Sequence, residues 1–220
     1  MKFGKQLPVI SKIMPLTNNL YRLKKVDVYK ASLVLRDAFM DYPAFKYLFP
    51  EINERKKKLR FVMMFFIKCG LLQGEVIAPS KNLECISIWY HSGNLNMGFT
   101  GLLKAGLLST IYNLNIKSFV QFKNLGDAKK DNRKALLENE YYLLDIIGVD
   151  PSFERQGYAR HVIDTMIEKM EKENVSCFLE TSNFTNIDYY KKFGFALINN
   201  YTYNGLESYC MIRKMNAENS

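Results

Sequence analysis

The sequence contains few of the residues on which metal and disulfide chemistry depend. Its 220 residues include only two histidines and four cysteines, and no two cysteines form a C-x-x-C pair. Because zinc sites need closely spaced Cys and His ligands, this spacing argues against a metal site. The cysteines lie among apolar neighbours, which predicts buried free thiols in a reducing compartment, the cytoplasm. They are Cys69, Cys85, Cys177 and Cys210.

Long hydrophobic runs are also absent. Near the start of the chain, Lys2 and Lys5 are not followed by the continuous apolar core of a signal peptide. The most apolar region, residues 93–125, is interrupted by glycine, asparagine, serine and Lys104, so it does not have the pattern of a membrane span. We therefore expect no membrane partner.

Acidic residues are outnumbered by basic ones. The chain has 31 Lys and Arg against 22 Asp and Glu, a formal charge of +9. This charge favours an anionic partner such as a polyphosphate cofactor, a nucleic acid or an acidic surface. Apart from Lys129-Lys130 and the run Arg55–Lys58, which we interpret as the solvated face of a helix start, the basic residues are dispersed. Dispersed charge argues against a nucleic-acid partner.

The composition and length are typical of one globular domain. Because no repeat or linker divides the chain, we expect a single domain over residues 1–220, with residues 1–19 as a loosely attached arm and residues 93–138 as a helical insertion. Hydrophobic periodicity predicts several helices and strands, whose order indicates an α/β (α+β) fold, a mixed sheet with helices on its faces. The predicted helices span 27–39, 53–72, 157–172 and 183–193, and the predicted strands span 75–78, 83–91, 141–149, 176–181, 196–200 and 207–214.

The segment Asp145–Arg160, DIIGVDPSFERQGYAR, is the most informative part of the chain. A strand-like run meets a turn at Pro151, and a loop with the small residues Gly157 and Ala159 then opens a helix. This arrangement presents backbone N–H groups to a phosphate. Taken alone, the loop is equally compatible with a plain βα connection in which Gly157 allows close packing.

A second pattern follows in residues 183–195, NFTNIDYYKKFGF. Asn186 and Tyr190 are four residues apart and therefore share one face of a helix. Asparagine can hydrogen-bond an amide-rich ligand, and tyrosine can donate a proton from its phenol. Tyr190 by itself, in a chain with 14 tyrosines, is more readily interpreted as a core aromatic.

Together these segments resemble the cofactor half of the GNAT superfamily of acyl-CoA-dependent N-acetyltransferases. The family loop is usually [QR]-x-x-G-x-[GA]; here it reads ERQGYA over residues 154–159, with Gly157 and Ala159 in place and Glu154 where Gln or Arg is usual. The IGVDP stretch at 147–151 is similar to the strand that precedes this loop. Residues 180–195 are similar to the family's later motif.

The resemblance implies a mixed, mostly antiparallel central sheet with a splayed parallel strand pair and helices on both faces. It also implies that acetyl-CoA is the cosubstrate. The loop backbone and its arginines would bind the pyrophosphate, the strand backbone and Asn186 would bind the pantetheine arm, and Tyr190 would donate a proton to the CoA thiolate. The implied cofactor-binding residues are Ile147, Val149, Arg155, Gln156, Gly157, Tyr158, Ala159, Arg160 and Asn186.

The general base is open between two carboxylates. An amine has a pKa of about 10, so a proton must be removed before it attacks. Strand alternation predicts that Asp145 shares a face with Ile147 and Val149, and Glu180 lies on the neighbouring strand. Either can act as the base, directly or through a water, and either can be an ordinary structural carboxylate.

The acceptor site is expected where the family varies, in the first helices and the insertion. Its candidate lining is apolar and aromatic, and this composition suits protein core equally well. The candidates are Tyr42, Phe45, Trp89, Tyr90 and residues 97–125.

The sequence therefore predicts an enzyme, an N-acetyltransferase that transfers acetyl from acetyl-CoA to the primary amine of a small acceptor within a ternary complex. It needs no metal, and a homodimer is left open. The alternatives are a non-catalytic CoA-binding or sensing module, a protein N-acetyltransferase and, less compatible with the dispersed charge, a nucleic-acid binder.

Overall fold

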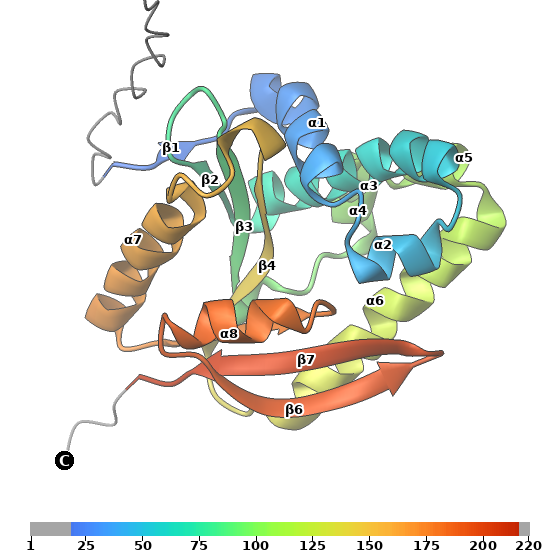
Figure 1. Cartoon of the computed structure of the whole chain (residues 1–220). Helices are drawn as coiled ribbons and strands as arrows, with labels where there is room; N and C mark the ends of the chain where they lie inside the picture. Colours follow the sequence, from blue (N-terminus) through green and yellow to red (C-terminus); the bar gives the residue numbers. More distant parts are fainter. Residues whose placement is uncertain (1–18, 216–220) are drawn as a thin grey trace, which may run out of the picture.

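The computed structural model describes residues 19–215, so the predicted arm at 1–19 lies outside them except for Asn19. A seven-stranded sheet runs through these residues in the order β1-β2-β3-β4-β5-β7-β6 (Figure 1). All neighbouring strands are antiparallel except the parallel pair β4 and β5, which confirms the predicted mixed, mostly antiparallel sheet. The strands are β1 (Tyr21–Arg22), β2 (Glu75–Ala78), β3 (Cys85–His91), β4 (Tyr141–Val149), β5 (Ser176–Thr181), β6 (Ala196–Tyr203) and β7 (Leu206–Arg213).

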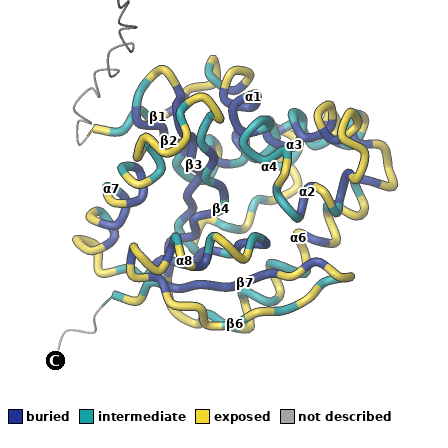
Figure 2. The backbone as a smooth tube through the Cα atoms, in the orientation of Figure 1, coloured by how far each residue is buried: buried dark blue, intermediate teal, exposed yellow. Residues whose placement is uncertain are grey.

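Helices cover both faces of the sheet, as predicted, and on each face a hydrophobic core lies between the sheet and its helices. Side chains of α1, α2, α3, α5 and α6 form the first core, and side chains of α7 and α8 form the second. Dark blue in Figure 2 marks the central strands as buried, whereas the edge strand β6 is largely exposed. The helices are α1 (Val28–Ala38), α2 (Pro43–Leu48), α3 (Ile52–Gln73), α4 (Phe99–Ala105), α5 (Leu107–Leu114), α6 (Ile116–Leu136), α7 (Tyr158–Glu173) and α8 (Thr185–Lys191).

The parallel strands β4 and β5 separate half-way along β4. Their pairing covers Tyr141–Leu144 against Ser176–Leu179 and ends there. Beyond that point, β5 remains paired with β7 and β4 remains paired with β3. The last five residues of β4 therefore have an edge without a strand partner among the described residues.

A β-bulge in β4 changes which side chains share a face. Ile88 of β3 pairs with Ile146, but Trp89 pairs with Leu144, so Asp145 is an extra residue in β4. One extra residue reverses the alternation beyond it. Ile146 accordingly packs in the first core, while Ile147 and Val149 pack against the second. The prediction that Asp145 shares a face with Ile147 and Val149 was wrong.

The basic run at the start of α3 also differs from the prediction. Arg55 and Lys58 are buried rather than solvated. Arg55 donates to the carbonyls of Phe49 and Pro50 at 2.8 and 2.9 Å, and Lys58 donates to the Ser118 hydroxyl at 2.7 Å. Arg55 thus binds the segment before α3, and Lys58 binds helix α6. The pattern of charges in the sequence does not reveal these tertiary contacts.

The thiols agree with the prediction, because all four cysteines are free and three of them are buried. Between residues 19 and 215, no helix combines the length and the apolar character needed to cross a bilayer.

Candidate functional site

A groove of about 770 Å³ lies where the loop between β4 and α7 faces helix α8. It brings together nine residues that the sequence analysis selected: Ile147, Val149, Arg155, Gly157, Tyr158, Ala159, Arg160, Asn186 and Tyr190. Residues separated by more than 40 positions thus line one groove. Whether they bind a cofactor stays a prediction.

The loop into α7 has the geometry of an anion site. Gly157 has a φ of 86°, which favours glycine, and a Cβ there would meet nothing within 4 Å. Among the described residues no side chain caps α7, so its first-turn N–H groups are available to a ligand. Arg155 and Arg160 add positive charge to the groove, while Glu154 adds one negative charge.

The edge of β4 faces the same groove. The N–H of Asp150 donates to the Glu84 carbonyl beside β3, at 2.9 Å. Since successive N–H groups of a strand point to opposite edges, the N–H groups of Val149 and Ile147 point away from β3, to where β5 has separated. An extended ligand can pair with these groups as an added strand.

Helix α8 contributes Asn186 and Tyr190 from one face, as the spacing predicts. The Asn186 amide donates to the Thr181 hydroxyl at 3.2 Å, which orients it. Tyr190 is only 7% exposed, and burial, with smaller effects of Tyr42 and Tyr189, raises its pKa well above the usual value. Its phenol is protonated at neutral pH, as an ordinary phenol is, and can donate a hydrogen bond or a proton.

One predicted cofactor residue lies apart from the others. The side chain of Gln156 donates to the Ser152 carbonyl at 3.3 Å and does not line the groove. Conversely, the groove includes Thr185 and Tyr189, which the sequence analysis did not select. These two residues also stand four apart on α8, so the spacing that selected Asn186 and Tyr190 could have selected them.

A second cavity, of about 350 Å³, lies on the other side of β4. Tyr42, Phe45 and Tyr90 line it as predicted, together with Met97, Leu102, Phe122 and Leu125 from the predicted insertion. Trp89 does not line it. Because neighbours along a strand point to opposite faces, Trp89 packs in the other core, where its indole N–H donates to the Ser87 hydroxyl at 2.8 Å.

Asp145, the bulged residue of β4, lines this second cavity. In the part of the chain that the structure describes, its carboxylate has no hydrogen-bond or ion-pair partner. Burial raises the pKa of Asp145 above its usual value, against the opposing influence of Arg133 and Lys129. A carboxyl group with a raised pKa in a cavity can take up a proton from a ligand.

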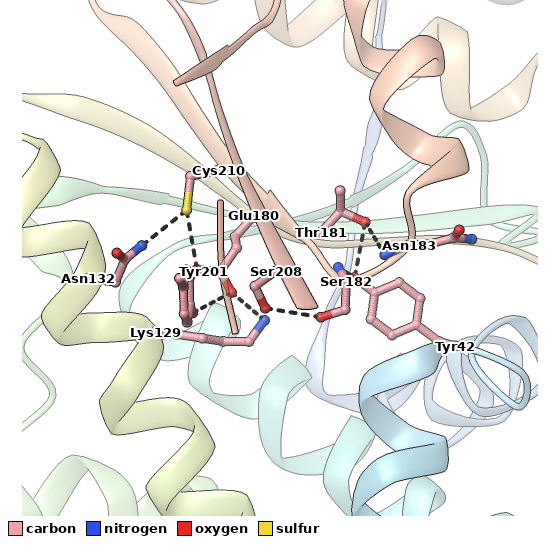
Figure 3. Close-up of polar contacts among 10 residues, drawn as sticks. All are labelled: Tyr42, Lys129, Asn132, Glu180, Thr181, Ser182, Asn183, Tyr201, Ser208 and Cys210. Atoms are coloured by element: carbon pink, nitrogen blue, oxygen red, sulfur yellow. Dashed lines mark hydrogen bonds and ion pairs between the residues drawn. The ribbon is translucent and has the colours of Figure 1, made fainter. Parts of the chain in front are cut away.

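Glu180 has a different environment from Asp145. Its side chain is 8% exposed and forms an ion pair with Lys129 of α6 at 2.9 Å (Figure 3). The Tyr201 hydroxyl donates to the same carboxylate at 3.1 Å, and the Cys210 thiol lies 3.9 Å from it. Burial acts to lower the pKa of Lys129, but Glu180, Tyr42 and Asp145 together outweigh burial, so the pKa of Lys129 is raised.

The basic residues of α6 were not selected from the sequence, although a signal exists. Phe122, Leu125, Lys129, Arg133 and Leu136 recur at helical spacing, so the two cations occupy the inward face of an otherwise apolar stripe. Lys129 and Arg133 both line the second cavity.

Polar contacts connect the two cavities. The N–H of Ser182 donates to the Tyr42 hydroxyl at 2.7 Å, and that hydroxyl lies 3.1 Å from the hydroxyl of Thr181 (Figure 3). Thr181 in turn accepts from Asn186 in the groove. The groove and the cavity thus approach each other where β4 and β5 separate.

Comparison with known proteins shows which family the chain is similar to. The model of the acetyltransferase (GNAT) family matches residues 111–195, which include β4, α7, β5 and α8. A protein of Schizosaccharomyces pombe described as an uncharacterised N-acetyltransferase is 29% identical over 181 residues, which are 80% of this chain and 73% of that protein. The chain is thus similar to GNAT acetyltransferases over the segments that carry its motifs. The resemblance of its motifs is confirmed, and its enzyme class is N-acetyltransferase.

Solved structures share the GNAT fold at low sequence identity. A Corynebacterium glutamicum structure described as histone acetyltransferase HPA2 and related acetyltransferase superposes with a TM-score of 0.63 at 13% identity, over 91% of this chain and 98% of the other. Arylalkylamine N-acetyltransferase 2 of Aedes aegypti gives 0.56 at 14% identity, over 90% and 99%. The two names refer to different acceptors, so the GNAT fold alone does not identify the acceptor of this protein.

Proposed function

We propose that this protein transfers the acetyl group of acetyl-CoA to the primary amine of a small-molecule acceptor, with both substrates bound at once. One observation carries the proposal. A groove with a phosphate-type loop and a cavity with an unpartnered carboxylate approach each other across the separated strands β4 and β5. A direct transfer needs this arrangement, because the two substrates must meet without sharing a site.

The groove fits acetyl-CoA in three respects. The open space above Gly157 and the uncapped start of α7 suit the pyrophosphate, and Arg155 and Arg160 balance its charge. The free edge of β4 at Ile147 and Val149 suits the amide-containing pantetheine arm. Asn186 can hydrogen-bond that arm from the opposite wall.

Three groups of the chain carry the chemistry in this proposal. Bound acetyl-CoA supplies an acetyl thioester. Asp145 takes one proton from the acceptor ammonium, and the free amine attacks the acetyl carbon. As the carbon–sulfur bond breaks, the nitrogen loses its second proton, which replaces through water the one that Tyr190 gives up. The Val149 N–H donates to the carbonyl oxygen, and a donor aimed in this way is typically worth about 3 kcal/mol. Tyr190 donates its proton to the departing sulfur.

We assign the base to Asp145 rather than to Glu180. Glu180 is held by Lys129 and Tyr201 and does not line the acceptor cavity, whereas Asp145 lines it without a partner. In this proposal Glu180 positions Lys129 of α6 and does not touch the acceptor.

The cavity favours a small molecule over a protein tail. Its volume of about 350 Å³ lies in the range of about 300–1,000 Å³ that is usual for small-ligand sites. Helices α4 and α6 contribute part of its wall through Leu102, Phe122 and Leu125. The four free thiols support a reducing compartment, and we propose the cytoplasm.

A panel of amines tests the proposal through the acetyl-CoA-dependent release of free thiol. The panel contains arylalkylamines, polyamines, amino acids, aminoglycosides and short peptides, with the matching alcohols as controls. We expect release with small amines and none with the alcohols. Tight CoA binding by calorimetry without turnover of any amine would support the non-catalytic module instead, and turnover of peptides alone would support a protein N-acetyltransferase.

A further inference from the structure

We propose that the acceptor carries a carboxylate next to its amine, on an aromatic or branched apolar body, and that Arg133 binds this carboxylate. The substrate class is then an apolar α-amino acid or a close analogue. This inference rests on the proposed function and concerns the acceptor side of the same site.

The walls of the cavity select the body of the acceptor. Phe45, Phe66, Tyr90, Met97, Leu102 and Phe122 line it. Binding an apolar group against such walls gains roughly 25 cal/mol for each Å² removed from water. A polyamine or a sugar would place several polar groups against these apolar walls, which is unfavourable. The body of the acceptor is therefore apolar.

Arg133 distinguishes this cavity from a site for a simple amine. Three basic side chains line the cavity, and two of them are neutralised by the chain itself: Lys129 pairs with Glu180 at 2.9 Å, and Lys123 pairs with Asp127 at 2.5 Å. Within residues 19–215, no hydrogen bond or ion pair engages the Arg133 guanidinium, although the residue is half-buried. A guanidinium in an apolar cavity is suited to a carboxylate, which it can bind through two parallel hydrogen bonds.

Asp145 and Arg133 both line the cavity. Arg133 is the charged group that most strongly favours the ionised form of Asp145, yet the two side chains form no ion pair. An ammonium group beside Asp145 and a carboxylate beside Arg133 would give each of these side chains an opposite charge. An acceptor with an amine alone would leave Arg133 with only the charge of Asp145, to which it forms no ion pair.

Matched substrate pairs test the inference. The pairs are phenylalanine with phenethylamine, tryptophan with tryptamine, and leucine with isoamylamine, followed by thiol release. In the wild type we expect the member with the carboxylate to have a kcat/KM at least about 10-fold higher. In Arg133→Leu we expect the preference for that member to fall by about 10- to 100-fold, and any change shared by both members reports the influence of Arg133 on Asp145. Lys134→Leu, at the exposed next residue of α6, is the control and leaves both members unchanged.

Different failures have different meanings. If both members of each pair react equally in the wild type, or if Arg133→Leu impairs both equally, the carboxylate inference is wrong while the acetyltransferase proposal stands. If no amine releases thiol, the proposed function fails, and calorimetry then decides the inference separately: phenylalanine should bind the CoA-loaded wild type and bind Arg133→Leu at least about 10-fold more weakly. The wild-type comparison needs no variant, so a folding defect cannot obscure the result.

Discussion

At the scale of single residues, burial shifts the pKa of the two proposed proton-transfer groups in the same direction. Burial raises the pKa of both Tyr190 and Asp145, because removal from water disfavours a negative charge. For Tyr190 this makes the phenol a weaker acid than an ordinary tyrosine, so in the proposed mechanism its proton moves only as negative charge builds on the sulfur. For Asp145 it brings an acid that is normally ionised closer to the pH at which a base is useful.

Removing the Tyr190 hydroxyl should affect catalysis but not the binding of acetyl-CoA. We expect Tyr190→Phe to lower kcat by about 100-fold or more, since one proton donor contributes about 10²–10⁴-fold. The affinity for acetyl-CoA should change little, because the ring contacts with Tyr189 and Phe195 remain. Turnover and calorimetry measure the two quantities, and Tyr189→Phe, in the same groove, is the matched control. An unchanged kcat would remove Tyr190 from the mechanism.

Replacing Asp145 should make the protein more stable and less active. Asp145→Asn removes a buried carboxylate without a partner, which should raise the free energy of unfolding at pH 7.5 by about 1 kcal/mol and the melting temperature by about 2–4 °C. A raised native pKa means that the wild type loses stability as pH rises through that pKa. The advantage of the variant should therefore shrink as pH falls toward the usual Asp pKa of about 3.9.

Activity is the second measurement on Asp145→Asn. The variant should lose about 100-fold or more in kcat. Glu180→Gln serves as the comparison, because Glu180 lies outside the acceptor cavity. A larger kcat loss in Glu180→Gln at equal thermal stability would transfer the role of base to Glu180.

At the scale of elements, two backbone irregularities organise the site. The bulge at Asp145 directs one part of β4 to the acceptor cavity and the next part to the groove. The left-handed conformation at Gly157 then turns the chain into α7 with its first-turn N–H groups toward the groove. Hydrophobic packing alone explains neither the extra residue at Asp145 nor the left-handed conformation of Gly157.

Gly157 permits a matched test of the loop. Gly205, in the β6–β7 hairpin, has nearly the same φ, 84° against 86°, and a Cβ at either position meets nothing within 4 Å. Gly157→Trp and Gly205→Trp should therefore lose similar stability, about 1 kcal/mol each. Only Gly157→Trp should weaken CoA binding, on the order of 10-fold or more by calorimetry. Equal CoA affinity of the two variants would mean that the pyrophosphate does not lie on this loop.

At the scale of the whole molecule, the pair Lys129–Glu180 joins helix α6 to the sheet. The surrounding network also includes Tyr201 of β6 and Cys210 of β7, while Asn132 of α6 donates to the Cys210 sulfur at 3.1 Å (Figure 3). Contacts from three strands and one helix therefore hold the wall of the acceptor cavity that carries Arg133.

Replacing only one residue of the Lys129–Glu180 pair should destabilise the protein. Lys129→Met leaves Glu180 buried without its cation and should destabilise the protein by about 2 kcal/mol, somewhat below the value for fully buried pairs because Lys129 is 28% exposed. The double variant Lys129→Met/Glu180→Met should recover part of that loss. Denaturant unfolding measures both, with Lys130→Met at the exposed neighbour as the control. A double variant less stable than Lys129→Met would contradict the stated role of the pair.

The sequence by itself determined the elements around the groove. The strand, the small-residue loop and the helical spacing of Asn186 and Tyr190 are local patterns, and local backbone geometry follows from them. For this reason the resemblance to the GNAT superfamily rests on residues 145–195, and nine of the ten cofactor and proton-donor candidates there line one groove. The exception, Gln156, bonds to a carbonyl four residues earlier, a choice that the loop pattern does not determine.

Only the tertiary structure decided the shape and the charge of the second cavity, where we propose that the acceptor binds. The bulge at Asp145 depends on how β3 pairs with β4, and no alternation rule within one strand predicts it. The burial of Lys58, the neutralisation of Lys129 and the unpartnered guanidinium of Arg133 depend on where α6 packs relative to α3 and β5. Charge and burial at a site come from segments distant in the sequence, so they are determined by packing rather than by local pattern.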